Sequence, residues 1–201
     1  FYLSLGDLES AIIELEELVE IAPETAQIYN LLGRIYLKLG RVDGAISLLE
    51  KAMEAGKGDS SLLESLAGAY IEKDRYADAI LLYEQLLKIN PSSKRILRTL
   101  SELYNRVSNY DSAAQKWAQM MNDDPEAVSE TTTKLEELSK LSPNSTYVLE
   151  QLAQAYIRSL KPAAAVQQLI KIMKLNPEKV DNVISILRHL LQTYPENQDG
   201  M

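Results

Sequence analysis

The feature that most constrains the fold is a set of side chains that recurs every 34 residues. Four tyrosines stand at this interval, an alanine follows each tyrosine after nine residues, and a large side chain follows each alanine after four. The tyrosines are Tyr2, Tyr36, Tyr70 and Tyr104, the alanines are Ala11, Ala45, Ala79 and Ala113, and the large residues are Leu15, Leu49, Tyr83 and Trp117. A fifth copy of the pattern carries Tyr156, Ala165, Leu169 and Pro177. A fixed period of this length indicates an array of short structural repeats.

Each repeat has the pattern of a helical hairpin. In residues 60–73 the apolar side chains Leu63, Leu66 and Tyr70 fall three or four positions apart, as on one face of an α-helix. Residues 76–89 show the same spacing, and only a short polar stretch separates the two segments. The two helices of each repeat are therefore expected to run antiparallel.

Small residues are expected where the two helices of a hairpin cross. The corresponding pairs are Gly33/Ala45, Ala67/Ala79, Ser101/Ala113 and Ala153/Ala165. Small side chains at both positions let the two backbones approach closely. One such hairpin cannot bury both of its faces, so neighbouring hairpins must stack and share a continuous all-α core.

The recurring set of a small residue and tyrosine, a central alanine, a large residue and a closing proline resembles the tetratricopeptide repeat family. The resemblance covers residues 1–125 and 146–179. It implies a right-handed α-solenoid of stacked antiparallel helix pairs, here with about eleven helices, and a concave groove lined by the first helix of each pair. Members of this family are usually adaptors that bind peptides, helices or folded partners and seldom catalyse reactions.

The same pattern divides the chain into segments. An N-terminal array is expected over residues 1–125, with a partial repeat at 1–25 and repeats at 26–59, 60–93 and 94–127. A single atypical helix or half repeat is expected at 126–145. A C-terminal part is expected over 146–195, with a repeat at 146–179 and a terminal helix at 180–194.

The segment at 126–145 breaks the period, because Tyr104 and Tyr156 are 52 residues apart. Its leucines fit a second helix, but Thr131 stands where the central alanine is expected, and it begins a run of three threonines with weak helix propensity. Either a lone helix replaces a hairpin and the array changes direction, or a normal repeat has lost its first half from the sequence. Both interpretations stay open at this point.

Composition removes several classes of function. The chain has no cysteine and a single histidine, His189, so neither a metal site with ordinary ligand spacing nor a Ser-His-Asp arrangement can be assembled. A net charge of −8 disfavours a general nucleic-acid binder. No apolar run is long enough to insert into a membrane. We therefore expect no catalytic site, no metal and no cofactor. The compartment stays open, with the cytoplasm favoured and the periplasm as the alternative, since the start of the chain looks truncated.

The candidate binding residues are cations and amides at positions that face the groove in the family. They are Asn30, Arg34, Lys38, Arg95, Arg98, Asn105 and Arg106. The planar guanidinium of arginine suits carboxylates and phosphates, so the sequence favours an acidic segment of a protein or peptide partner. The alternative is that Arg98 pairs with Glu102 along its own helix and Arg106 is solvated.

These observations favour a non-catalytic scaffold that holds a partner segment in its groove. The alternative is a structural segment of a larger assembly, such as a bacterial envelope or secretion machine, or the regulatory region of an enzyme. The last helix, at residues 180–194, has a broad apolar face, so association of two copies through terminal helices is a further expectation.

Overall fold

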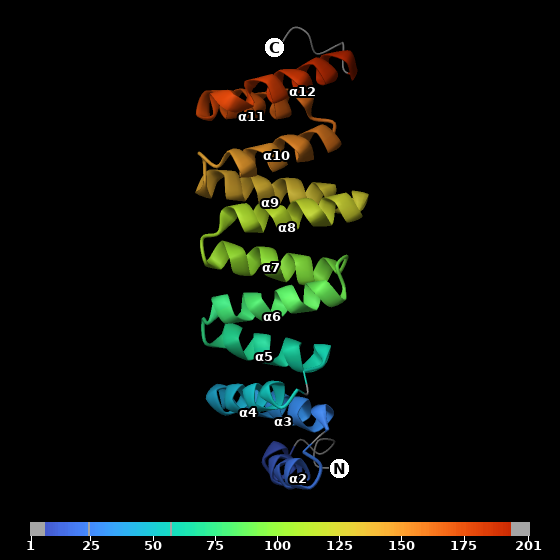
Figure 1. Cartoon of the computed structure of the whole chain (residues 1–201), viewed down its shortest axis with the longest axis vertical. Coiled ribbons are helices and arrows are strands. Elements are labelled where there is room, and N and C mark those ends of the chain that lie inside the picture. The colour runs from blue at the N-terminus through green and yellow to red at the C-terminus, as the bar shows by residue number, and fades with distance from the viewer. Residues whose placement is uncertain (1–6, 24, 57, 194–201) are drawn as a thin grey trace. The chain divides into compact units, whose positions relative to one another are not determined.

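The structure is a computed structural model that describes residues 7–23, 25–56 and 58–193. Within these residues it contains eleven α-helices, two short 3-10 helices and no strand (Figure 1). Contacts divide the chain into two compact units, residues 1–91 and residues 92–201, and each unit is described by itself. The expected all-α class of stacked antiparallel helix pairs is confirmed.

The first unit holds α2 (Leu8–Ile21), α3 (Ala26–Lys38), α4 (Val42–Glu54), α5 (Ser60–Glu72) and α6 (Tyr76–Ile89). The second unit holds α7 (Lys94–Arg106), α8 (Tyr110–Asp123), η1 (Pro125–Ala127), α9 (Val128–Leu141), α10 (Thr146–Arg158), α11 (Pro162–Leu175), η2 (Pro177–Lys179) and α12 (Val180–Thr193). The predicted helix end around Tyr2 lies outside the described residues, as does residue 194 of the predicted terminal helix. The predicted division into arrays and repeats stays a prediction.

The two helices of each hairpin cross at the small residues that the sequence indicates. Ala45 and Ala79 are fully buried. At Gly33 a Cβ atom would lie only 2.8 Å from Cδ2 of Leu49, so the backbone of α3 runs directly over the large residue of α4. In the second unit Ser101 donates a hydrogen bond of 3.3 Å to the backbone oxygen of Ala113. Close approach of paired helices is therefore the basis of each hairpin.

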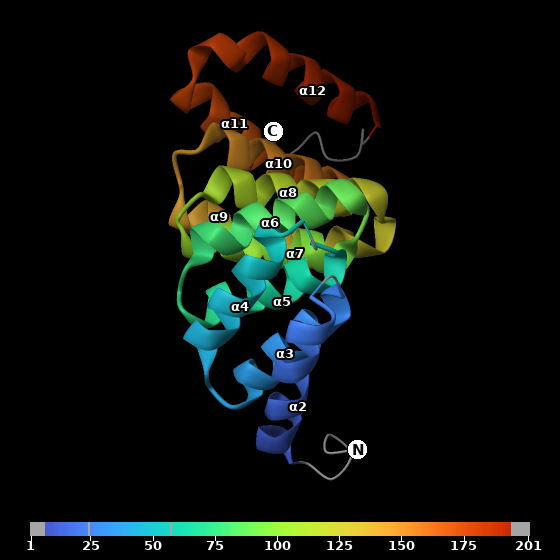
Figure 2. The same cartoon turned by 60° about the horizontal axis from the view of Figure 1, so that its bottom comes forward.

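In the first unit, α5 packs against both helices of the preceding hairpin, α3 and α4. The first helices of successive hairpins, α3 and α5, are therefore neighbours (Figure 2). This arrangement places the groove-facing positions of the two repeats next to each other.

The recurring tyrosine also marks the turn inside each hairpin. Its backbone oxygen accepts a hydrogen bond from the amide five residues later, and the residue before that amide has a positive φ. These residues are Gly40, Asp74, Ser108 and Leu160, with φ of 70°, 55°, 57° and 56°. The matching bonds are Arg41 to Tyr36, Arg75 to Tyr70, Asn109 to Tyr104 and Lys161 to Tyr156, at 2.8–2.9 Å. One left-handed residue thus closes each turn, whether or not it is glycine.

In three of the hairpins the phenol of the same tyrosine joins the hairpin to the helix before it. Tyr70 donates a hydrogen bond of 2.6 Å to Glu50 of α4, and Tyr36 donates to Glu16 of α2. In the second unit Tyr156 of α10 donates a bond of 2.8 Å to Glu136 of α9. Relative to α10, the atypical helix α9 therefore occupies the position that the second helix of a preceding hairpin would have.

The second unit consists of two copies of a three-helix module. Every element of α7–α8–η1–α9 begins 52 residues before its counterpart in α10–α11–η2–α12. The caps of the two 3-10 turns match as well. Oδ1 of Asp124 accepts from the amide of Glu126 at 3.0 Å, and Oδ1 of Asn176 accepts from the amide of Glu178 at 3.1 Å. The 52-residue spacing of Tyr104 and Tyr156 is thus a period of its own.

The threonine run lies inside α9, where each hydroxyl finds a carbonyl. Thr132 and Thr133 donate to the backbone oxygens of Val128 and Ser129, one turn earlier, at 2.7 and 3.2 Å. Thr131 is fully buried and lies 3.4 Å from the backbone oxygen of Trp117 in α8. Satisfied hydroxyls and the packing of α9 against α8 and α10 outweigh the weak helix propensity of these residues.

Contacts at both ends of α10 define its direction. Near its start, Oγ of Ser145 donates to Oδ1 of Asp111 at the start of α8, at 2.5 Å. Near its end, Nη1 of Arg158 donates to the backbone oxygen of Met121 near the end of α8, at 2.8 Å. The bond from Tyr156 to Glu136 joins the end of α10 to the middle of α9. Helix α10 therefore runs parallel to α8 and antiparallel to α9.

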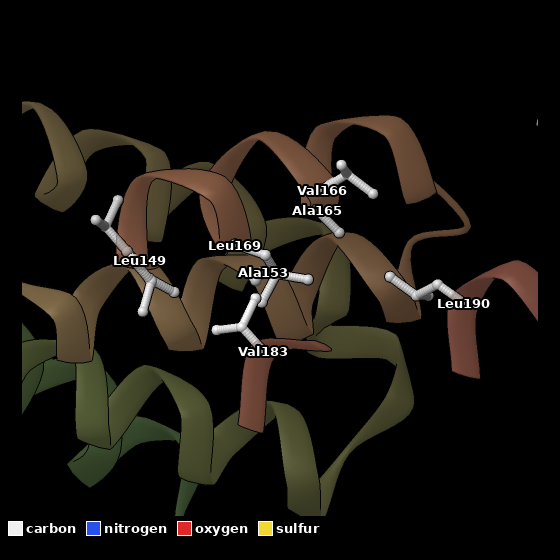
Figure 3. Packing of buried hydrophobic residues seen from close by; sticks show 8 residues of the cluster. Leu149, Ala153, Ala165, Val166, Leu169, Val183 and Leu190 are labelled. Atoms are coloured by element: carbon white, nitrogen blue, oxygen red, sulfur yellow. The ribbon is translucent and has the colours of Figure 1, made fainter. Parts of the chain in front are cut away.

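The core of the second three-helix copy is shown in Figure 3. It brings together Leu149 and Ala153 of α10, Ala165, Val166, Leu169 and Ile172 of α11, and Val183 and Leu190 of α12. These side chains are all buried, so α12 is held through one face that includes Val183 and Leu190.

The tyrosine–glutamate contacts predict a specific response to alkaline pH. Burial, followed by the hydrogen bond to Glu50, raises the pKa of Tyr70 to about 12 from an ordinary value near 10. The neutral phenol therefore stabilises the folded state below pH 10, and this contribution is lost as the pH rises through about 12. Tyr70→Phe is expected to lower the free energy of unfolding by about 1 kcal/mol at neutral pH.

Chemical unfolding followed by circular dichroism at a series of pH values measures this effect. Between pH 10 and 12 the stability of the wild type should fall more steeply than that of Tyr70→Phe, because only the wild type retains this phenol. Tyr156→Phe should behave alike in the second unit, since the pKa of Tyr156 is also raised to about 12. Parallel pH profiles of wild type and variant would contradict this account.

Candidate functional site

A shallow depression lies between the first helices α3 and α5 of the first unit. Its volume is about 320 Å³. It is lined by Arg34 and Leu37 of α3 and by Ser61, Glu64, Ser65, Gly68 and Glu72 of α5. Six of these seven residues occupy positions that face the groove in the family that the sequence resembles. We call this hollow the α3–α5 depression.

Asn30 fixes the two walls of the α3–α5 depression. Its Nδ2 donates a hydrogen bond of 2.5 Å to Oγ of Ser61, and its Oδ1 accepts one from the hydroxyl of Ser65. Both ends of the amide are therefore used between α3 and α5. Among the predicted binding residues, Asn30 thus acts here as a contact between repeats that shapes the surface.

Arg34 and Lys38 lie one and two turns further along α3, and both side chains are exposed. Within the described part of the chain, neither side chain makes a hydrogen bond or an ion pair. Glu64 and Glu72 line the opposite wall of the same depression. The surface therefore offers cations on one side and carboxylates on the other.

The remaining predicted binding residues lie on α7 in the second unit. Arg95, Asn105 and Arg106 are exposed, and Arg98 is half-buried. They belong to a different unit from Asn30, Arg34 and Lys38, so the residues of α3 and those of α7 are described as two candidate surfaces.

The ion pair of Arg98 differs from the expected alternative. Its partner is Glu130 of α9, not Glu102 on its own helix: Nε lies 2.8 Å from Oε1 and Nη2 lies 2.7 Å from Oε2. This two-point contact lowers the pKa of the Glu130 carboxyl, chiefly through the hydrogen bonds from Arg98. Since Arg98 ties α7 to α9, it is less available to a ligand than the exposed Asn105 and Arg106.

The second three-helix copy makes a related contact with reversed charges. Glu150 occupies the position of Arg98, and it pairs with Lys179 of η2 at 2.5 Å. Both copies therefore link their first helix to the segment after their second helix through an ion pair. Sequence periodicity alone could not indicate this link, because the cation lies on the first helix in one copy and after the second helix in the other.

A second hollow in the second unit was not expected from the sequence. It has a volume of about 470 Å³ and is bordered by Pro125, Glu126, Val128, Ser129, Thr132, Thr133, Glu136, Ser159 and Lys161. The hydroxyls of Thr132 and Ser159 lie 3.1 Å apart at its wall. The run of threonines was the one feature of the sequence that could have indicated this hollow, but their hydroxyls already donate hydrogen bonds to backbone oxygens of the protein.

Metal-ligating side chains do not gather in the part of the chain that the structure describes. It contains no cluster of three or more metal-ligating His, Cys, Asp or Glu residues. His189 is exposed on α12. Among the described helices, none combines the length and the apolar character needed to cross a membrane.

Comparison with known families gives three overlapping matches. Models described as "Tetratricopeptide repeat" match residues 24–92 and 65–126, and one described as "TPR repeat" matches residues 2–40. No curated protein sequence matches the chain at a significant level. Together the three family models span residues 2–126 without a gap, which is more than half of the chain.

Several solved structures are similar to the chain. A crystal structure of MamA aligns over 90% of this chain and 95% of its own, with a TM-score of 0.55 and 17% identity. A tetratricopeptide repeat protein from Parabacteroides merdae aligns over 87% and 76%, with a TM-score of 0.57 and 21% identity. MamA from Desulfovibrio magneticus, residues 41 to the end, aligns over 89% and 90%, with a TM-score of 0.53 and 15% identity. At these identities the likeness shows the fold alone.

Proposed function

Because this chain belongs to the tetratricopeptide repeat family, we propose that it is a non-catalytic scaffold that binds a segment of a partner protein along the first helices of its hairpins. The family and its structural neighbours support a role in protein interaction. The observation that carries the proposed site is the α3–α5 depression, whose walls are already held by Asn30 before any partner arrives. A surface that need not order itself on binding costs less conformational entropy.

The proposed ligand is an extended or helical segment that includes acidic residues. Arg34 and Lys38 in the first unit are exposed, with no ion pair inside the described protein. Arg106 in the second unit is equally exposed at the end of α7. Carboxylates of a partner can therefore bind these cations without first breaking an internal contact.

A selection of peptides on the intact protein tests this proposal. Peptides from a displayed random library would be chosen for binding and then titrated against the variants Arg34→Glu/Lys38→Glu and Arg95→Glu/Arg106→Glu. We expect at least one reversal to weaken binding about tenfold or more, because lost charge-assisted contacts cost about 1.5–3 kcal/mol.

The matched control is Lys51→Glu, a reversal on the exposed side of the second helix α4. It should leave the affinity within about twofold, since second helices do not line the proposed surface. Equal weakening by all three reversals would indicate a general charge effect. No effect of either groove variant would exclude both candidate surfaces.

A structural role in a larger assembly is the second candidate function. The observation that favours it is the apolar surface of the last hairpin, where Ile170 and Leu191 are substantially exposed. In a larger assembly, such as an envelope or secretion machine or a regulated enzyme, another component would cover this apolar surface.

A further inference from the structure

The two copies of the three-helix module differ in what covers them. In the first copy, α10 packs against both α8 and α9. The corresponding surface of the second copy is formed by α11 and α12, and no described helix lies on it (Figures 1 and 2). The internal repeat therefore shows the same surface once with a helix bound and once without.

Burial differs between equivalent positions of the two copies. Ala118 of α8 is 6% exposed, whereas its counterpart Ile170 of α11 is 43% exposed. Leu135 of α9 is completely buried, whereas its counterpart Leu187 is only partly buried. The surface of the second copy thus carries apolar area that a helix in the place of α10 would remove from water.

The uncovered surface is more apolar than the covered one. Ile170, Ile184 and Leu191 stand where the first copy has Ala118, Thr132 and Ser139. We call these three residues, together with the partly buried Met173 and Leu187, the α11–α12 face. Exposed apolar side chains that gather on one surface usually mark a contact site. This face has the composition of a contact surface.

The charges beside the α11–α12 face indicate what kind of helix it accepts. Arg188 replaces Glu136, the residue that accepts a hydrogen bond from Tyr156 of α10. Lys171 and Lys174 replace Gln119 and Asn122. The three cations are exposed and make no ion pair within the described residues. A helix in the place of α10 would therefore meet positive charge where α10 meets a carboxylate.

We propose that the α11–α12 face binds an amphipathic α-helix of a partner protein, which lies on it as α10 lies on α8 and α9 and places a carboxylate opposite Arg188. A second copy of the same face fits less well, because Lys171, Lys174 and Arg188 of two copies would be brought together. This site is formed by other helices than the α3–α5 depression and the candidate residues of α7.

The probes for this site are two synthetic peptides based on residues 144–160, which include α10 and its capping Ser145. One carries Tyr156→Glu and the other carries Tyr156→Lys. Fluorescence anisotropy with the intact protein should show the glutamate peptide binding about threefold to fivefold more tightly, the range of a partly exposed ion pair. In Arg188→Glu the preference should reverse and favour the lysine peptide.

Two matched variants on α11 test the apolar part. Ile170 lies on the α11–α12 face and is 43% exposed, whereas Leu175 is 42% exposed and corresponds to Asp123, which stays exposed beside α10. Ile170→Asp should weaken both peptides about tenfold or more, and Leu175→Asp should leave them unchanged. Because both side chains are already similarly exposed, the two variants should fold alike, which circular dichroism would verify.

Three outcomes would overturn the proposal. The first is no binding of either peptide, and the second is equal binding of both peptides whatever residue stands at position 188. The third is a dimer in analytical ultracentrifugation that Ile170→Asp dissociates and Leu175→Asp does not, which would assign the face to a second copy. Arg34→Glu/Lys38→Glu should not alter peptide binding here, so a failure of the proposed groove and a failure of this face can be told apart.

Discussion

Replacing Trp117 with alanine is expected to lower the free energy of unfolding of the second unit by about 3–5 kcal/mol, the usual cost of truncating a buried aromatic side chain to a methyl group. Trp117 is the single tryptophan of the chain and is only 3% exposed in the middle of α8. Helix α8 packs against α7, α9 and α10, so the cavity would lie at the centre of the first three-helix copy. The backbone oxygen of Trp117 also accepts a hydrogen bond from the hydroxyl of Thr131 in α9.

Urea unfolding followed by far-UV circular dichroism measures this loss, because the variant has no tryptophan fluorescence. The control is Leu141→Ala on the adjacent helix α9, where the side chain is 53% exposed and the expected change is within about 0.5 kcal/mol. If the two units unfold in separate transitions, only that of residues 92–201 should move. A loss below about 1 kcal/mol for Trp117→Ala would mean that α8 is not the centre of this unit.

Leu135→Ala is expected to cost about 2–5 kcal/mol, and Leu187→Ala at the equivalent position of the second copy should cost about half as much or less. Leu135 is fully buried in α9, which packs against α10, whereas Leu187 in α12 is only partly buried. The two substitutions remove the same atoms from the same position of the module. Their difference therefore measures what the covering helix contributes.

The same unfolding assay compares the pair. Thr133→Ala, an exposed change on α9, controls for effects of substitution on the helix itself and should be nearly neutral. Equal losses at Leu135 and Leu187 would show that burial beneath α10 adds nothing. A loss below about 1 kcal/mol at Leu135 would show that α9 is only loosely attached to the unit.

The 34-residue pattern was sufficient to predict the hairpins because each recurring residue has one physical task. Ala45 and Ala79 are small where helices cross, and both are fully buried. Tyr70 closes a turn with its backbone and joins the previous helix with its phenol. Constraints of this kind act between residues of the same or neighbouring repeats and recur every 34 residues, so a single sequence is enough to reveal them.

The three-helix module was harder to predict because its signals are spread over a longer distance. The spacing of 52 residues between Tyr104 and Tyr156 is visible in the sequence, but by itself it indicates only a break in the 34-residue period. The last helix repeats α9 only weakly in sequence, with Ile184 in place of Thr132 and Arg188 in place of Glu136. Shared backbone positions with different side chains leave little periodic signal.

The candidate surfaces were predicted only in part. Arg34 does lie at a hollow between first helices, which its position in the repeat indicated. The use of Asn30 between α3 and α5 and the contact of Arg98 with Glu130 depend on which helices become neighbours. Such pairings join residues about thirty positions apart and follow from packing, so a linear pattern does not contain them.

The odd number of helices in the module has a consequence for how the array can grow. A hairpin returns the chain to its starting edge, so successive first helices point the same way, as α3 and α5 do. A module of three helices ends on the opposite edge, and α10 consequently runs against the direction of α7. Gain or loss of one three-helix module would therefore reverse the direction of every helix that follows it. The turns between those helices would then lie on the opposite edge of the array, and a bound strand or helix would meet first helices that run the other way. Only an even number of modules would restore the original direction.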